Sequence, residues 1–319
     1  MKHVFILNAF AGKKSSVDEL KEKIRALRLD CECVIEITKC RGDAKEIARK
    51  HVSSTDEFVR VYACGGDGTA NEAMSGMVGF SNCALGVIPV GTGNDFVKSF
   101  DYSKDDFSDL EKMTKGEVVT IDLLKCNGNY AMNTISVGYD CAVAKQAQKI
   151  KRFPLMTGPA AYKAALVYCL FSKRRHTFKT YADDKLINLP KGYKTQMMCV
   201  AGNGMYYGGG FKATPYASFS DGNIDFLSVP TVSLLQFAQL IGPFIKGEHI
   251  GHEKAQFIVH KKCKKLQFKD DVPIDIGLDG EIYNIKDPVI TVEPKAFSVI
   301  IPEILKESSQ KKCTVLRDL

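Results

Sequence analysis

Two glycine-rich loops, each placed directly after a short apolar run, constrain most strongly what this chain can fold into. The run at residues 58–63 (FVRVYA) leads into the loop at residues 65–69 (GGDGT), and the run at residues 85–89 leads into the loop at residues 91–95 (GTGND). Glycine permits close backbone approach and conformations that other residues avoid. An apolar run, such a loop and then a helical pattern together indicate parallel strands with helices on the faces of the sheet.

The rest of the first hundred residues continues this alternation. We expect further strands at residues 3–8 and 33–37, and helices at residues 16–28, 43–51 and 70–77. In parallel α/β sheets, ligands bind beyond the carboxyl ends of the strands. The loops at residues 8–12, 65–69 and 91–95 all follow strands, so the sequence predicts one ligand site at that edge.

From about residue 117 the pattern changes to short β-like runs separated by turn residues. Turns such as Asn127-Gly128, Asp221-Gly222 and Asp279-Gly280 separate these runs. The expected strands are residues 118–124, 130–137, 177–182, 196–201, 224–229, 256–259, 265–268, 289–292 and 297–301. Two helical patterns interrupt them, at residues 158–174 and 231–245. We therefore predict a second domain that is mainly antiparallel β.

Composition limits the class of protein. Hydrophobic residues make up 45% and charged residues 25% of the 319, as is typical of soluble globular proteins. The longest apolar run, residues 164–171, is far shorter than the roughly 18–20 residues that span a bilayer. The 11 cysteines form no CxxC pair, which favours reduced core residues. The net charge of +7 suits nucleotides or an acidic membrane surface, and we expect a cytoplasmic protein.

The loop at residues 65–69 has the properties of a phosphate site, with one unusual residue. A helix that begins at such a loop presents free backbone N–H groups and its positive dipole end to an anion. Asp67 would repel phosphate unless it holds Mg²⁺ or takes part in proton transfer. A tight turn with Asp67 as the helix cap is the alternative. Neither loop contains G-x-G-x-x-G, and residues 11–15 lack the first glycine of a P-loop, so both of those sites are excluded.

Two motifs in the second half also point to a close approach of chain or ligand. Three consecutive glycines occur at residues 208–210, and Asp-Gly pairs occur at Asp221-Gly222 and Asp279-Gly280. Consecutive glycines are typical of a segment over which a ligand or another chain segment passes. Asp-Gly is also the commonest short hairpin turn, so Glu281, read alone, is a structural residue.

Taken together, GGDGT, PVGTGNDF, NGMYYGGGFKATPYASFSDG and LDGE, in this order and spacing, resemble the diacylglycerol kinase catalytic family, and in particular its soluble bacterial members. The resemblance covers residues 2–302. It implies a nucleotide-binding α/β domain with an NAD kinase-like fold at residues 1–120 together with 296–319. It also implies a β-rich lipid-binding domain at residues 121–295, with the active site in the cleft between the domains.

The resemblance also implies roles for single residues. Glu281 corresponds to the family's general base, with Asp67 placing Mg²⁺–ATP, whereas in an NAD kinase Asp67 would be the base. A structural Mg²⁺ would be held by Asp221 with Ser218 and Asn223. The chain has NAFAG where relatives often have NPxSG, which puts the contact at Ala11 in doubt. The implied nucleotide-binding residues are Asn8, Ala9, Phe10, Ala11, Gly12, Thr38, Gly66, Asp67, Gly68, Thr69, Ala70, Asn71, Glu72 and Thr92.

The implied activity is ATP- and Mg²⁺-dependent phosphorylation of the diacylglycerol hydroxyl to phosphatidic acid, a step of phospholipid biosynthesis. Three alternatives stay open: another lipid alcohol such as a sphingoid base, NAD, or a non-catalytic sensor of the same fold. We expect transient contact with the inner face of the membrane, no nucleic-acid partner and, by resemblance, a homodimer. The apolar segment 162–176, which ends in Lys173, Arg174 and Arg175, is the candidate membrane contact; a buried helix is its alternative.

Overall fold

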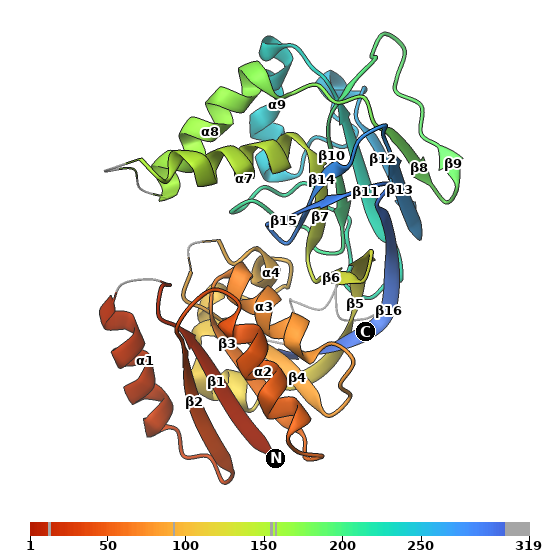
Figure 1. The fold of residues 1–319 in the computed structure, drawn as a ribbon. Coiled ribbons are helices and arrows are strands. Elements are labelled where there is room, and N and C mark those ends of the chain that lie inside the picture. Colours follow the sequence, from red (N-terminus) through yellow and green to blue (C-terminus); the bar gives the residue numbers. More distant parts are fainter. Residues whose placement is uncertain (12–13, 92, 154–155, 157, 304–319) are drawn as a thin grey trace. The chain divides into compact units, whose positions relative to one another are not determined.

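The computed structural model describes residues 1–11, 14–91, 93–153, 156 and 158–303 (Figure 1). The chain forms two compact units. The first contains Met1–Leu123, Phe219–Asp221 and the chain from Pro294 onward. The second contains Leu124–Ser218 and Gly222–Glu293. The chain therefore passes between the units several times.

The first unit is built on a parallel sheet, as the alternating pattern predicts. Its strands lie in the order β2-β1-β3-β4-β16. β1 pairs with β2 and β3, and β4 pairs with β3 and β16, all in parallel. The bounds are β1 (Lys2–Asn8), β2 (Glu32–Thr38), β3 (Val59–Gly65), β4 (Cys83–Pro89) and β16 (Val289–Ile301).

Four of the helices described in this unit directly follow strands, and three of these four are the ones that the sequence predicts. α2 and α3 pack against each other and against the sheet (Figure 1). Their apolar sides supply buried residues such as Ala44, Ala48, Ala73 and Met77. The bounds are α1 (Lys14–Ala26), α2 (Asp43–Ser53), α3 (Asp67–Met77), α4 (Asp95–Lys98), α5 (Lys104–Ser108) and α6 (Leu110–Thr114).

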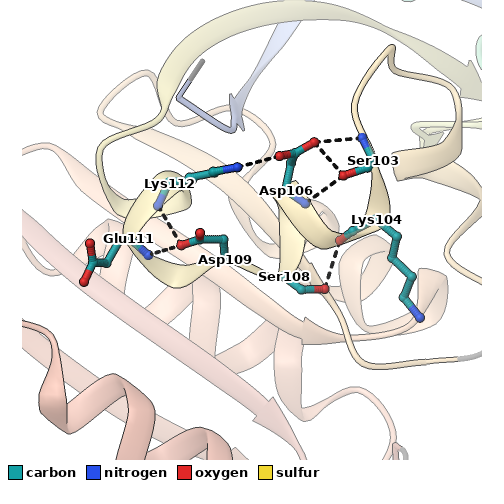
Figure 2. Close-up of polar contacts among 7 residues, drawn as sticks. All are labelled: Ser103, Lys104, Asp106, Ser108, Asp109, Glu111 and Lys112. Carbon is teal, nitrogen blue, oxygen red and sulfur yellow. Dashed lines mark hydrogen bonds and ion pairs between the residues drawn. The ribbon is translucent and has the colours of Figure 1, made fainter. Parts of the chain in front are cut away.

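Side-chain caps stabilise the two short helices α5 and α6, which have too few residues for a periodic pattern (Figure 2). The Ser103 hydroxyl accepts from the Asp106 N–H, and the Asp106 carboxylate accepts from the Ser103 N–H, which forms a capping box. Asp109 caps α6 by accepting from two backbone N–H groups. Lys112 donates to Asp106 over 2.7 Å and, together with Ser103, lowers the Asp106 pKa to about 2.

The second unit is an antiparallel β structure. Its six-stranded sheet has the order β12-β11-β10-β7-β14-β15, with antiparallel neighbours throughout. Those strands are β7 (Thr134–Gly138), β10 (Gln196–Gly202), β11 (Ile224–Pro230), β12 (Val259–Cys263), β14 (Ile274–Leu278) and β15 (Glu281–Ile285). The others are the end of β5 (Glu117–Cys126), β6 (Asn129–Ala131), β8 (Lys179–Ala182), β9 (Lys185–Leu186), β13 (Lys265–Lys269) and the start of β16.

The central strands of this six-stranded sheet are buried on both faces. Successive side chains of a strand point to opposite faces. On β10, Cys199 and Ala201 join the core shared with β8 and β13, whereas Met198 and Val200 join the core under the helices. Figure 1 shows α7 (Tyr139–Ile150), α8 (Gly158–Ser172) and α9 (Leu234–Lys246) grouped beside this sheet. A short 3₁₀ helix, η1 (Glu253–Ala255), follows α9.

Several details differ from the sequence prediction. The expected strand at residues 130–137 is broken at Met132 and Asn133, whose N–H groups donate to Asp279 instead of to a neighbouring strand. Residues 256–258 form a turn after η1, and the strand begins only at Val259. The two strands expected at residues 289–292 and 297–301 are one, β16. The helix α7 was not predicted.

Candidate active site

Three loops converge at the carboxyl edge of the first unit's sheet, as predicted. The Asn8 side-chain amide at the end of β1 donates to the Thr69 hydroxyl of α3 over 2.7 Å. The Phe10 N–H donates to Asn8 Oδ1 over 2.8 Å. Asn8 therefore ties the first loop to the first turn of α3.

The two glycine loops contact each other through their backbones. The N–H groups of Val90 and Gly91 donate to the Gly65 carbonyl over 2.9 and 3.0 Å. A Cβ atom at Gly91 would lie 2.7 Å from the Cα of Gly66, so no other residue fits there without displacing the loop. The glycines thus bring the ends of β3 and β4 together around the N-terminus of α3.

Asp67, in the first of these loops, approaches the second loop and the residue that follows it. Its Oδ1 accepts from the Phe96 N–H over 3.1 Å, and a Cβ atom on Gly93 would approach its Oδ2 to 2.8 Å. The helix α3 takes Gly66 as its N-cap and has no side-chain cap. The interpretation of Asp67 as a capping residue is therefore wrong. The carboxylate instead stands beside a helix N-terminus, where backbone N–H groups favour negative charge.

The other predicted nucleotide-binding residues differ in how far they are exposed to solvent. Ala9, Phe10 and Gly68 are exposed, and the Phe10 ring has 73% of its surface accessible. Thr38 and Ala70 are buried. Asn71 is also buried, whereas Ala11, Gly66 and Glu72 are half-buried. Ala70, whose methyl group lies in the core, can meet a ligand only through its backbone. Gly12 and Thr92 lie outside the described residues.

Glu281 begins β15 in the second unit. Asp279 and Gly280, with φ values of 45° and 91°, form the two-residue turn between β14 and β15. Positive φ at both positions defines the type I′ turn, which suits Asp-Gly. Leu278 and Glu281 are the pair that flanks the turn, and the Glu281 side chain is half-buried. The hairpin interpretation of Asp279-Gly280 is therefore correct, and it places Glu281 at a fixed point of a rigid turn.

Asp279 holds that turn in place. Its carboxylate accepts from three successive backbone N–H groups, those of Met132, Asn133 and Thr134, over 2.7, 3.0 and 2.8 Å. The Asp279 N–H donates back to the Thr134 carbonyl over 3.0 Å. These partners are about 145 residues away in the sequence. Sequence reasoning did not find this role, because the motif shows the turn but not the partner.

We expect Asp279→Ala to lower the free energy of unfolding by about 2–4 kcal/mol, because each hydrogen bond to a charged group is worth about 1.5–3 kcal/mol and water replaces part of that at a half-buried site. Chemical denaturation followed by circular dichroism measures this. The matched control is Asp271→Ala, at an exposed residue of the β13–β14 connection, which should change stability by less than about 0.5 kcal/mol. Equal stability of the two variants would contradict the anchoring role.

The glycine-rich segment after β10 contacts the same connection between β6 and β7. The Asn203 amide donates to the Met132 carbonyl over 2.7 Å, and the Asn133 amide donates to the Tyr206 carbonyl. Thr214 donates to the Gly204 carbonyl over 2.8 Å. The NGMYYGGG and LDGE motifs, distant in the sequence, are therefore neighbours within the second unit.

The predicted Mg²⁺ residues lie where the chain crosses between units. Phe219 belongs to the first unit, where its ring packs on Phe96 and Phe100. Its carbonyl accepts from the Asp122 N–H over 2.6 Å. In the part of the chain that the structure describes, no group of three His, Cys, Asp or Glu side chains could hold a metal. The implied site would consist of the Asp221 carboxylate and the backbone carbonyls of Ser218 and Asn223. It therefore does not require a group of three such side chains.

The second unit also contains an apolar cavity of about 260 Å³. It lies between α7, α8, α9 and the strands β10 and β11. Its lining includes Tyr162, Leu166, Met198, Phe237, Phe244 and Ile258. No sequence signal indicated the cavity, because its walls come from five separate elements. A pocket with this lining suits an apolar ligand.

The α/β unit, whose glycine loops surround a helix N-terminus, has the geometry of an anion site at that N-terminus. The model of the diacylglycerol kinase catalytic domain matches residues 2–126. The model of the YegS C-terminal NAD kinase beta sandwich-like domain matches residues 133–301. The chain belongs to this family of lipid and diacylglycerol kinases.

Individual relatives agree with the family models. The chain is 29% identical to a diacylglycerol kinase of Bacillus subtilis over 247 residues, which are 76% of this chain and 77% of that protein. A crystal structure of a diacylglycerol kinase from Bacillus anthracis superposes with a TM-score of 0.67 at 21% identity, covering 94% of this chain and 96% of that one. A second crystal structure from the same organism gives 0.73 at 22% identity, covering 95% and 98%. Both structures have the same fold as this chain.

Proposed function

We propose that the protein transfers the γ-phosphate of ATP to the hydroxyl of diacylglycerol, which forms phosphatidic acid. The observation that carries the proposal is the convergence of three loops on Asp67 at the N-terminus of α3. The apolar cavity of the second unit supports a lipid as the acceptor. The name of the Bacillus subtilis relative supports diacylglycerol among lipids.

The nucleotide phosphates would lie along residues 65–69. Free N–H groups at the start of α3 and the helix dipole stabilise negative charge there. Mg²⁺ arrives with ATP as part of the substrate, and Asp67 offers the carboxylate oxygens that Mg²⁺ prefers. The hydrogen bond from the Phe96 N–H fixes the orientation of this carboxylate. Phosphoryl transfer depends mainly on such positioning and on charge neutralisation.

Glu281 would act as the general base. As the lipid oxygen attacks the γ-phosphorus, Glu281 accepts the hydroxyl proton, the new O–P bond forms, and the bond to the β–γ bridging oxygen breaks to release ADP. Asp279 holds the turn that carries Glu281, so the base needs little reorganisation during the reaction. The test is ADP formation from Mg²⁺–ATP with and without micellar diacylglycerol. ATP binding without lipid-dependent ADP formation would favour a sensor.

We also propose the structural Mg²⁺ at Asp221, with carbonyl groups of Ser218 and Asn223. A hard cation with oxygen ligands would reinforce the crossing segment that Phe219 anchors. We expect Mg²⁺ without nucleotide to raise the melting temperature of the wild type by about 4 °C, which for a chain of this size corresponds to about 2–3 kcal/mol. Asp221→Asn should lose that shift. An equal shift in both proteins, measured by calorimetry, would contradict the site.

The contact with a membrane is proposed for α8. Ala161, Ala165 and Cys169 are buried, whereas Val167 and Phe171 are 61% and 68% exposed. The helix thus shows apolar side chains on its outer face as well, which the buried-helix interpretation does not explain. Lys173, Arg174 and Arg175 follow it and would attract anionic lipid. No helix among the described residues is long and apolar enough to cross a bilayer. We propose peripheral association with the inner face of the membrane.

We expect the double variant Val167→Ser/Phe171→Ser to weaken binding to vesicles of anionic phospholipid by about 10-fold or more. Without these two exposed apolar side chains, less apolar area is buried in the membrane, which lowers the free energy of binding by at least about 1.4 kcal/mol. Vesicle cosedimentation measures the affinity. The control is Leu186→Ser on β9, which is 47% exposed. A control variant that binds as weakly as the double variant would argue against α8 as the contact.

A further inference from the structure

The apolar cavity of the second unit contains one carboxyl group. Asp140, in the first turn of α7, belongs to its lining, together with tyrosines and aliphatic or aromatic residues. The lining that the structure describes includes no lysine, arginine or histidine. A carboxyl group without a cationic partner is unusual in such surroundings, because burying a charge is costly. The proposed function so far gives Asp140 no role.

One oxygen of Asp140 has no partner. Within the described residues, the buried Oδ2 makes no hydrogen bond. Tyr207, which also lines the cavity, interacts with the Asp140 carboxyl group. Buried polar atoms almost always have partners, and the exceptions call for an explanation such as a ligand. Asp140 lines the cavity, and a ligand that reaches Oδ2 would supply the missing hydrogen bond.

The surroundings of Asp140 favour its neutral form. Burial raises its pKa from 3.8 to about 7. The titratable groups that interact with it are Tyr139, Tyr207, Cys141 and Cys199, and burial raises the pKa of each. All four are uncharged at neutral pH. Tyr207 favours the carboxylate, but the effect of burial is larger. Oδ2, which makes no hydrogen bond, is the oxygen left to carry the proton and to donate it.

We propose that the Asp140 carboxyl group is a specificity determinant of the cavity and that its Oδ2 donates a hydrogen bond to the ester carbonyl of a bound acyl lipid. This inference rests on the proposed function and names the substrate class of the same site: an acyl ester, rather than an ether lipid or a sphingoid base. An ether lacks the carbonyl acceptor. The ammonium of a sphingoid base would require an ionised carboxylate.

The test is a calorimetric binding measurement without ATP at pH 6. The ligands are 1,2-dioctanoylglycerol and its dioctyl ether counterpart, which lacks both carbonyl groups. We expect the wild type to bind the ester about 10-fold more tightly than the ether, because the ether leaves the buried Asp140 donor without an acceptor and so forfeits that hydrogen bond. Asp140→Asn keeps a donor and should keep the preference. Asp140→Leu removes the donor and should bind both ligands equally.

Either of two results would overturn the inference: equal affinities of the wild type for ester and ether, or an ester preference that survives in Asp140→Leu. If Asp140→Leu does not fold, the pH dependence of the ester preference tests the inference instead. The preference of the wild type should decline between pH 6 and pH 8.5 as Asp140 ionises, whereas that of Asp140→Asn should not. A preference that stays constant in the wild type would also overturn it. Because no ATP is present, an ester preference without any phosphorylation of diacylglycerol would refute the proposed function alone.

Discussion

Replacing Glu281 by glutamine lowers kcat for phosphorylation of dioctanoylglycerol by about 10²–10⁴-fold, the usual contribution of a general base. Glutamine has nearly the same shape but cannot accept the proton of the attacking hydroxyl. The Asp279 anchor is untouched, so the variant keeps the β14–β15 turn. Steady-state kinetics at saturating Mg²⁺–ATP give the change in kcat, and the KM for ATP should stay within about threefold because the base acts only in the transition state.

The matched control is Glu248→Gln, since Glu248 is an exposed glutamate after α9. It should keep kcat within about twofold, as surface substitutions away from a site usually do. If Glu281→Gln turned over at the wild-type rate, Glu281 would not be the base. The NAD kinase-like assignment, in which Asp67 accepts the proton, would then replace it.

The second large effect is expected at Asp67. Asparagine keeps an oxygen to accept from the Phe96 N–H but loses the charge that would hold Mg²⁺. We expect Asp67→Asn to lower kcat/KM for Mg²⁺–ATP by about 100-fold or more, since metal-assisted charge stabilisation is worth several kcal/mol. Raising the Mg²⁺ concentration should restore part of the loss, and titrating Mg²⁺ in the kinetic assay measures this.

A charge-neutralising change elsewhere in the same unit serves as the control. Asp101→Asn, at an exposed aspartate after α4, should leave both kcat/KM and its Mg²⁺ dependence unchanged. If Asp67→Asn showed the Mg²⁺ dependence of the wild type, Asp67 would have no part in placing the metal. Loss of folding is excluded by thermal unfolding of each variant beside the wild type.

The fold of the first unit follows from its sequence because local signals agree there. The strands β1, β3 and β4 are short, mainly apolar runs, and each of the two glycine loops marks the point where a strand ends and a helix begins. The contact of Gly91 with Gly66 shows why glycine is required at that point. The closeness of Asp67 to both loops was predictable for the same reason, since neighbouring parallel strands end at one edge.

The second unit was harder to predict. In α7 the buried residues Tyr139, Cys141 and Val143 alternate, which resembles a strand continuing from β7 rather than a helix. In β16, Pro294 and Lys295 suggest a break, but the strand continues through Lys295 at a φ of 48°, where its N–H donates to Asp122.

Long-range partners explain the remaining differences. Asp279 is satisfied by residues far away in the sequence, and the lining of the cavity comes from α7, α8, α9, β10 and β11. No local pattern encodes such a meeting. The motif LDGE could therefore indicate a turn and, through the family resemblance, a base. The motif could not predict the hydrogen bonds of Asp279 that hold the turn, and it gives no information on the carboxyl group of Asp140 in the cavity.

The identity of the phosphorylated product tests the central claim most directly. Wild-type protein is given ATP labelled at the γ-phosphate, Mg²⁺ and micelles that contain diacylglycerol, a sphingoid base or neither, with NAD in a separate reaction. Chromatography then locates the label. The account predicts label in phosphatidic acid, and none there with Glu281→Gln over the same time. Label in NADP or in a sphingoid base phosphate, with none in phosphatidic acid, would contradict it.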